Sequence, residues 1–164
     1  MRENSAKSVL LLRVKPGSVN EAIQELKSHP EVSYAEPVLG TYDILATGNF
    51  PDMQSLQNFA TAIQQDGFCE AFYVSPAVEH WERNGATTQE YSAWTLINTS
   101  TPTQTWKDLQ QFPNVSSAYI TLGSSNVVAH ITASKPQEIN KTILTSIQKI
   151  RGIRRTETFV EAKP

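Results

Sequence analysis

Two kinds of hydrophobic spacing alternate along the chain and predict its elements. Residues 9–14 form a short, mainly aliphatic run that does not alternate and stops at Pro16-Gly17, which is typical of a strand covered on both faces. Apolar positions at helical spacing follow over residues 19–26, and Pro30 ends that helix. The next predicted elements are two strands joined through Gly40, a helix and a further strand: 32–39, 42–48, 52–66 and 68–75. The first half of the chain therefore has the order β-α-β-β-α-β.

The same order recurs in the second half, where identical residues lie a constant 83 positions further along. The matching pairs are Leu26 and Leu109, Pro30 and Pro113, Val32 and Val115, Ser33 and Ser116, Ala35 and Ala118, and Gly40 and Gly123. We therefore predict a first repeat at 6–78, a linker at 79–89 and a second repeat at 90–162. The segment 83–88 between the repeats has the polar, glycine-containing composition of a linker.

The repeated order predicts an α+β fold made of two ferredoxin-like βαββαβ repeats. Connection rules place both helices of each repeat on one face of a four-stranded antiparallel sheet. Apolar strands such as 9–12 and 127–129 require a cover on the other face as well, and a second sheet can provide it. We therefore expect a fold of the dimeric α/β-barrel type, either as a pseudo-dimer within one chain or by pairing between chains.

Size and charge narrow the possible functions. The chain has 164 residues, a net charge of -2 and a pI near 5.9, so we expect no direct binding to nucleic acid. No apolar run is long enough to span a bilayer, and residues 1–5 lack the pattern of a signal peptide. We therefore expect a cytoplasmic protein that does not associate with membranes.

Gly40-Thr41-Tyr42-Asp43 joins two predicted strands and is the most distinctive short motif. Glycine can reverse the chain, and its small side chain leaves neighbouring backbone N–H groups accessible. Together with Lys15-Pro16-Gly17 and Pro30-Glu31-Val32, this motif resembles the effector-binding domain of the Lrp/AsnC family, also called the RAM domain. The chain resembles a tandem duplication of that domain. Only about six residues precede the first strand, so the helix-turn-helix of the DNA-binding relatives is not expected.

The resemblance implies a small-molecule binding function. In the family, effectors such as amino acids bind beside this corner, which implies a ligand site at Gly40, Thr41, Tyr42 and Asp43. In the second repeat the corresponding corner contains Ser124, Ser125 and Asn126, where an amide replaces the carboxylate. The expected function is that of a non-enzymatic, amino-acid-like effector sensor related to transcription regulation. It would act through oligomer assembly, with its own copies or with Lrp/AsnC relatives as partners.

The histidines suggest an alternative to the effector-sensor function. No convergent set of acid, base and nucleophile indicates catalysis, and we expect no cofactor and no metal site. His80 and His130 leave open a metal- or haem-binding barrel protein or enzyme, because some barrels of related shape bind haem. Cys69 is expected to be a half-buried structural residue. The cluster of Lys149, Arg151, Arg154 and Arg155 is expected to protect a strand edge, and we expect Trp94 to pack in the core.

Overall fold

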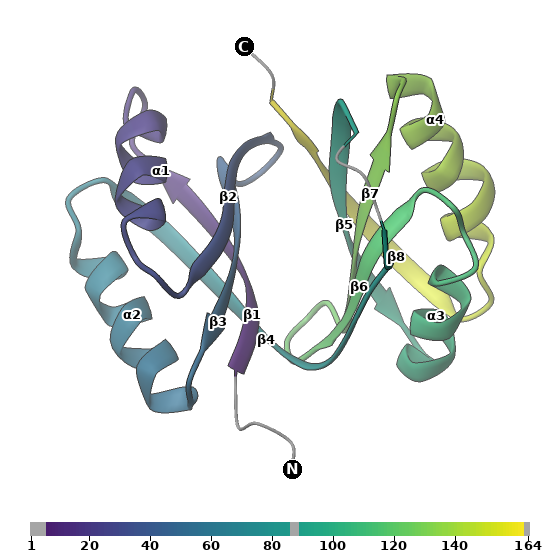
Figure 1. Ribbon diagram of the computed structural model, residues 1–164, viewed down its shortest axis with the longest axis horizontal. Coiled ribbons are helices and arrows are strands. Elements are labelled where there is room, and N and C mark those ends of the chain that lie inside the picture. Colours follow the sequence, from purple (N-terminus) through teal and green to yellow (C-terminus); the bar gives the residue numbers. More distant parts are fainter. Residues whose placement is uncertain (1–5, 86–88, 163–164) are drawn as a thin grey trace. The chain divides into compact units, whose positions relative to one another are not determined.

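The computed structural model describes residues 6–85 and 89–162, which divide into two compact units (Figure 1). The first unit runs to Ala77 and also includes Ala162, while the second runs from Val78 to Glu161. Each unit is a four-stranded antiparallel sheet with its helices on one face.

The first unit has the predicted order of elements. They are β1 (Ala6–Val14), α1 (Val19–Lys27), β2 (Val32–Leu39), β3 (Ile44–Phe50), α2 (Met53–Gln65) and β4 (Cys69–Glu82). The strands lie in the order β2-β3-β1-β4, so the central strands are β1 and β3. Asp52 caps α2, because its carboxylate accepts a 2.7 Å hydrogen bond from the N–H of Ser55.

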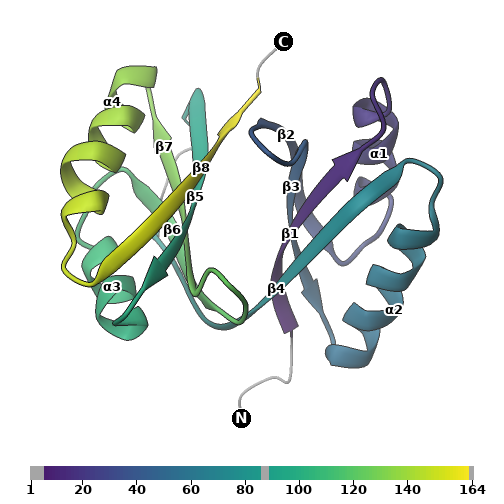
Figure 2. The same ribbon diagram turned by 180° about the vertical axis from the view of Figure 1, so that it is seen from behind.

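The second unit repeats this order. Its elements are β5 (Tyr91–Thr99), α3 (Pro102–Leu109), β6 (Val115–Thr121), β7 (Val127–Ala133), α4 (Pro136–Lys141) and β8 (Ile153–Glu161). After α4 the helical path continues through a wide turn, Thr142–Ser146, and a tight turn, Ile147–Lys149. The strand order β6-β7-β5-β8 is that of the first unit, and Figure 2 shows β5 and β8 from behind.

Each unit has its own hydrophobic core between sheet and helices. In the first, Leu10 and Leu12 of β1 pack with Leu26 of α1 and Ile63 of α2, all fully buried. The second core includes four isoleucines from the α4 region. They are Ile139, Ile143, Ile147 and Ile150. Because strand side chains alternate between faces, every second residue of each strand faces away from this core.

The predicted fold class is confirmed: the chain is α+β, with two ferredoxin-like βαββαβ repeats of the dimeric α/β-barrel type. The predicted linker needs a correction, because β4 continues through Glu82. Residues 79–82 therefore belong to a strand. Residues 86–88 of the predicted linker lie outside the described residues. Within the part of the chain that the structure describes, no helix is long and apolar enough to cross a membrane.

Candidate functional site

The first corner, predicted as a ligand site, connects β2 to β3 through Gly40, whose φ is 148°. Thr41 is exposed, and Tyr42 and Asp43 are half-buried. The Asp43 carboxylate accepts a 2.9 Å hydrogen bond from the N–H of Val14, and the Asp43 N–H donates to the carbonyl of Leu12 at 2.8 Å. Asp43 therefore fastens the corner to the end of β1, and ligand binding there stays a prediction.

The second corner is fastened in the same way. Gly123 has a φ of 137°, and the side-chain oxygen of Asn126 accepts from the N–H of Thr99 at 3.0 Å. The Asn126 amide also donates to the carbonyl of Thr99 at 2.9 Å. The carbonyls of Ser124 and Ser125 accept hydrogen bonds from Asn98 and Thr121. A shared backbone role thus explains why an acid stands at one corner and an amide at the other.

A different group of residues lies on the second sheet, on the face away from the helices. Trp94 of β5 stands directly opposite His130 of β7, and their rings stack with centroids 4.2 Å apart and planes 14° from parallel. On the other side of Trp94, Phe159 of β8 is its direct partner. Trp94 is 2% exposed and Phe159 1%. The three rings come from three neighbouring strands and are brought together by the register of the sheet.

Two further rings extend this group, which we call the aromatic face: His80, Trp94, Tyr119, His130 and Phe159. The Tyr119 ring lies 6.3 Å from that of Trp94 and 6.2 Å from that of His80, measured between centroids. Burial raises the pKa of the Tyr119 hydroxyl, and the nearby Glu82 carboxylate raises it further, against a hydrogen bond from Ser117 that lowers it. Tyr119 is therefore a neutral phenol at physiological pH.

His130 is the chemically distinctive member of the aromatic face. Burial lowers its pKa to about 4, so the imidazole is neutral at physiological pH. Its Nδ1 lies 3.0 Å from the hydroxyl oxygen of Ser116, which also donates to the His130 carbonyl at 3.2 Å. A neutral imidazole can ligate a metal ion or accept a proton.

The first repeat lacks an equivalent group. The strand pairings match Trp94, His130 and Phe159 with Val9, Thr47 and Ser75, because Val9 stands opposite Thr47 and Ser75 in the first sheet. Tyr119 is likewise matched by Glu36, since each stands opposite the equivalent residue of the neighbouring strand. The specialised sheet face is thus in the second repeat, although its corner motif is the less complete one.

Arg83 fixes the end of β4 beside this sheet. Its guanidinium donates to the carbonyls of Val115, Gln110 and Phe112 at 3.1, 3.2 and 2.9 Å, and it lies 4.9 Å from the ring centre of Trp81. Trp81 packs against the core on the helix side. Because neighbouring strand residues face opposite ways, this places His80 on the other face. The predicted linker included Arg83, so the sequence did not indicate this role.

The side chains that the structure describes form no ligand set for a bare metal ion. Across residues 6–85 and 89–162, no group of three or more His, Cys, Asp or Glu side chains is placed to hold one. Cys69 is half-buried, and its pKa is raised by burial and by the charge of Asp66, which keeps the thiol protonated.

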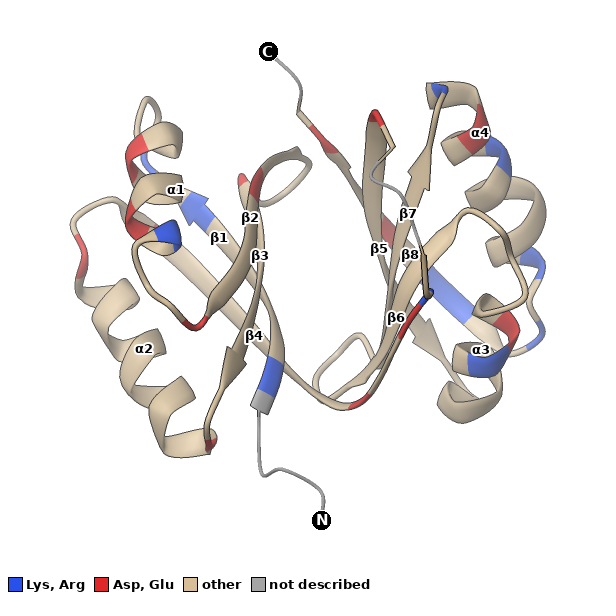
Figure 3. Ribbon diagram, in the orientation of Figure 1, with Lys and Arg blue, Asp and Glu red and all other residues tan. Residues whose placement is uncertain are grey.

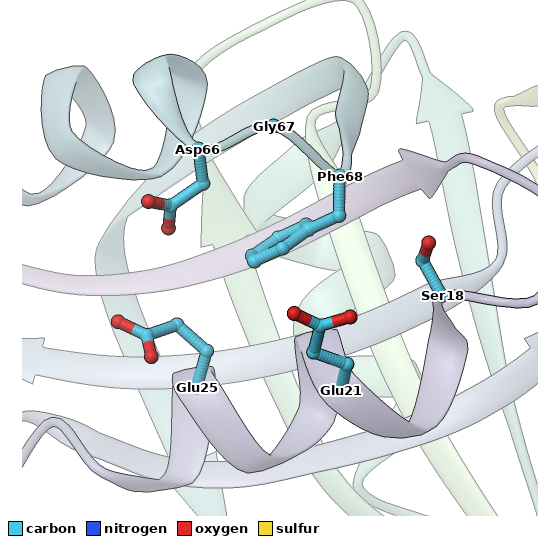
Figure 4. A pocket seen from close by; sticks show the side chains of 6 residues that line it. All are labelled: Ser18, Glu21, Glu25, Asp66, Gly67 and Phe68. Carbon is cyan, nitrogen blue, oxygen red and sulfur yellow. The ribbon is translucent and has the colours of Figure 1, made fainter.

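The first unit contains an acidic pocket of about 360 Å³ beside α1. It is lined by Ser18, Glu21, Glu25, Asp66, Gly67 and Phe68. Figure 4 shows the three carboxylates arranged around the Phe68 ring. Three negative charges here disfavour an anionic ligand. Two other pockets, of about 430 and 420 Å³, lie beside Met53 and Val74 and beside Phe112 and Lys141.

The comparisons with known proteins agree on the fold. The sequence matches the family described as the Lrp/AsnC ligand binding domain over residues 7–80 and 97–163. No curated protein matches. The siroheme decarboxylase NirDL, in co-complex with an iron-uroporphyrin III analogue, is similar with a TM-score of 0.76 and 10% identity, over 98% of this chain and 72% of that one. An anthrone oxidase-like protein is similar with a TM-score of 0.58 and 7% identity, over 98% and 91%.

These matches overturn the expectation of a non-enzymatic amino-acid sensor. The solved structures that resemble the whole chain carry the names of a decarboxylase and an oxidase-like protein. That expectation rested on the corner motif, whose Asp43 and Asn126 side chains hydrogen-bond to the backbone of neighbouring strands. The alternative built on His80 and His130 agrees better with the aromatic face.

Proposed function

We propose that this chain, which belongs to the Lrp/AsnC ligand-binding domain family, binds a haem-type iron tetrapyrrole as its small-molecule ligand. The tetrapyrrole would bind at the aromatic face of the second repeat as the substrate or prosthetic group of an enzyme. The similarity of fold to a siroheme decarboxylase, solved with an iron-uroporphyrin analogue, supports this class of ligand.

The observation that carries the proposal is the combination of a neutral histidine with large aromatic rings and no multidentate metal site. Side chains that bind a bare transition metal usually supply three or four ligands. The described residues offer no such group. A tetrapyrrole brings four nitrogens of its own, so one protein histidine is enough to hold its iron.

The donor set also fits a flat conjugated ring. Trp94, Tyr119 and Phe159 are large aromatic side chains that lie buried on this face, and aromatic rings stack favourably on another aromatic system. His130 remains neutral far below physiological pH, so no proton has to be removed before its nitrogen binds iron. When bound, the iron supplies a Lewis-acidic and redox-active centre that these residues lack.

A cation for the carboxylates of such a ligand is available on the same sheet. The basic residues of the second unit gather at the start of β8 and on the neighbouring helices (Figure 3). Arg155 stands four residues before Phe159 on β8. Side chains four residues apart share a strand face and lie about 13 Å from one another. That spacing suits a ring carrying acidic groups at its rim.

The proposal is tested by titrating the purified full chain with hemin and recording the absorption spectrum. Wild-type protein should give a saturable shift of the main haem band, which His130→Ala should remove or strongly weaken. His80→Ala should have a smaller effect. His29→Ala is the matched control, because His29 lies in the first unit against Phe59 and should leave the spectrum unchanged.

Two further ligands separate iron ligation from simple stacking. Metal-free protoporphyrin should bind more weakly than hemin and should be insensitive to His130→Ala. Iron-uroporphyrin tests the contribution of peripheral carboxylates, and Arg155→Gln should weaken its binding more than that of hemin. Mass spectrometry of the recovered iron-uroporphyrin checks whether carboxyl groups are lost. An absence of saturable binding by all three compounds contradicts the proposal.

A further inference from the structure

Ser116 occupies a position that the fold itself creates. The register between β6 and β7 shifts between Val115 and Ser117, which leaves Ser116 as the extra residue of a β-bulge. A bulge turns a side chain away from the regular alternation and often re-aims it at a functional site. Here the hydroxyl oxygen lies 3.0 Å from Nδ1 of His130 and 3.2 Å from the His130 carbonyl oxygen.

The first repeat contains an equivalent bulged serine, but its partner is not a histidine. The register between β2 and β3 shifts between Val32 and Tyr34, so Ser33 is the bulged residue. Its hydroxyl oxygen lies 3.2 Å from the carbonyl oxygen of Thr47 and 3.0 Å from the Thr47 hydroxyl. The two serines therefore make the same pair of contacts, and only the side chain of their partner differs.

Donor counting ties the tautomer of His130 to the hydrogen bond that Ser116 donates to the His130 carbonyl. A carbonyl oxygen can only accept a hydrogen bond, and a serine hydroxyl has a single hydrogen. When that hydrogen is donated to the His130 carbonyl, Ser116 can only accept from the ring. The Nδ1 atom must then carry the proton, and the lone pair of the neutral imidazole is on Nε2.

We infer that Ser116 is a positioning residue that holds His130 in the Nδ1–H tautomer, so that Nε2 is the nitrogen able to bind iron or take a proton. This inference rests on the proposed function for its purpose, while the tautomer itself is a property of the ligand-free chain. Metal-binding histidines commonly donate their other N–H to an oxygen in this way, which fixes both ring orientation and tautomer. A neutral histidine without such a partner favours the Nε2–H form. An effect of Ser116 would therefore be measurable as a change in the tautomer of His130.

The test measures ¹⁵N chemical shifts of the histidine side chains in the full chain at pH 7.5 without ligand. The signal that disappears in His130→Asn identifies His130, and His29 and His80 serve as internal references. We expect wild-type His130 to be predominantly Nδ1–H. Ser116→Ala should move its shifts towards the Nε2–H form, and Ser116→Thr, which keeps the hydroxyl, should restore them.

Ser33→Ala is the matched control, because it removes the equivalent hydroxyl from the first repeat and should leave His130 unchanged. An Nε2–H form in the wild-type protein overturns the inference. Because this result comes from the wild-type spectrum alone, it does not depend on whether Ser116→Ala folds. A folded Ser116→Ala variant with wild-type shifts overturns it as well.

A hemin titration then separates this inference from the proposed function. Loss of such an outer partner typically weakens metal binding by roughly 10- to 100-fold, so Ser116→Ala should weaken hemin binding by that factor while Ser33→Ala does not. If wild-type protein binds no tetrapyrrole, the proposed function fails although the tautomer result stands. If hemin binds through His130 and the tautomer is Nε2–H, only the role of Ser116 is wrong.

Discussion

The indole of Trp94 and the imidazole of His130 lie face to face, with ring centroids 4.2 Å apart. They stand directly opposite one another on β5 and β7, so the stack is fixed by the register of the two strands. The indole covers one side of the imidazole and helps to keep water away from it. Burial lowers the pKa of His130, and the stacked indole contributes to that burial.

This burial predicts a loss of stability in mild acid. The pKa of His130 is about 4 in the folded chain and near 6.5 when the histidine is exposed by unfolding. Between these values the unfolded chain binds the additional proton, so the contribution is complete above pH 6.5 and is lost as the pH falls towards 4. The loss should amount to about 3 kcal/mol.

Urea unfolding of the wild type and of His130→Gln between pH 7.5 and 4 measures this effect. Carboxylates titrate in both proteins, so the relevant quantity is the difference between the two stability curves. The variant should lose less stability than the wild type over this range. Parallel curves would show that His130 is not desolvated in the folded state.

Replacing Trp94 should both destabilise the fold and release His130. Trp94→Ala removes a side chain that is 2% exposed, and such changes cost about 3–5 kcal/mol. Water that enters the vacated space should raise the pKa of His130 towards its ordinary value. Val9→Ala, at the equivalent position of the first sheet, should leave the His130 titration unchanged. Proton NMR follows the His130 pKa, and thermal unfolding follows the stability.

Asp43 and Asn126, at the two corners, should stabilise the fold through their hydrogen bonds to the backbone of the neighbouring strands. Asp43→Ala leaves the backbone N–H of buried Val14 without the carboxylate that it donates to, which should cost about 1–3 kcal/mol. Asp43→Asn keeps an acceptor oxygen and should cost less. Asn126→Ala, in the second repeat, should resemble Asp43→Ala because it removes the hydrogen bonds to Thr99. Chemical denaturation of the four proteins, including the wild type, makes the comparison, and an unaffected Asp43→Ala would contradict it.

Arg83→Lys should be poorly tolerated despite the conserved charge. The planar guanidinium donates to three carbonyls at once, and a lysine ammonium cannot reproduce that fork. We expect a loss of about 1–3 kcal/mol for the carbonyls left without their donor. Thermal unfolding compares Arg83→Lys with Lys107→Arg on the exposed surface of α3, which should be neutral. Equal melting temperatures for both variants and the wild type would exclude this role.

Most of the fold could be predicted from the sequence because its signals are local. Pro30 and Pro113 precede equivalent strands, and Gly40 and Gly123 form the two corners with positive φ. The identity of residues 83 positions apart revealed the repeat before any contact was known. The end of β4 was misplaced because its polar residues resemble a linker, although they continue a strand to Glu82.

The aromatic face was harder to predict, since Trp94, His130 and Phe159 come from three strands that are far apart in sequence. Only the strand register shows that they are neighbours. A usable signal was nevertheless present. Equivalent positions of the repeats differ clearly in chemistry where Val9 is replaced by Trp94 and Thr47 by His130. Comparing the repeats for such differences, rather than for identities, would have located this group.

The continuous strand β4 determines how the two repeats can be studied separately. The boundary between the compact units falls between Ala77 and Val78, inside this single strand. At the other end, the chain leaves β8 and Ala162 rejoins the first unit, where its N–H donates to the carbonyl of Pro37 at 2.9 Å. Cutting the gene at the boundary between the compact units would therefore sever β4 and would separate Ala162 from the first unit.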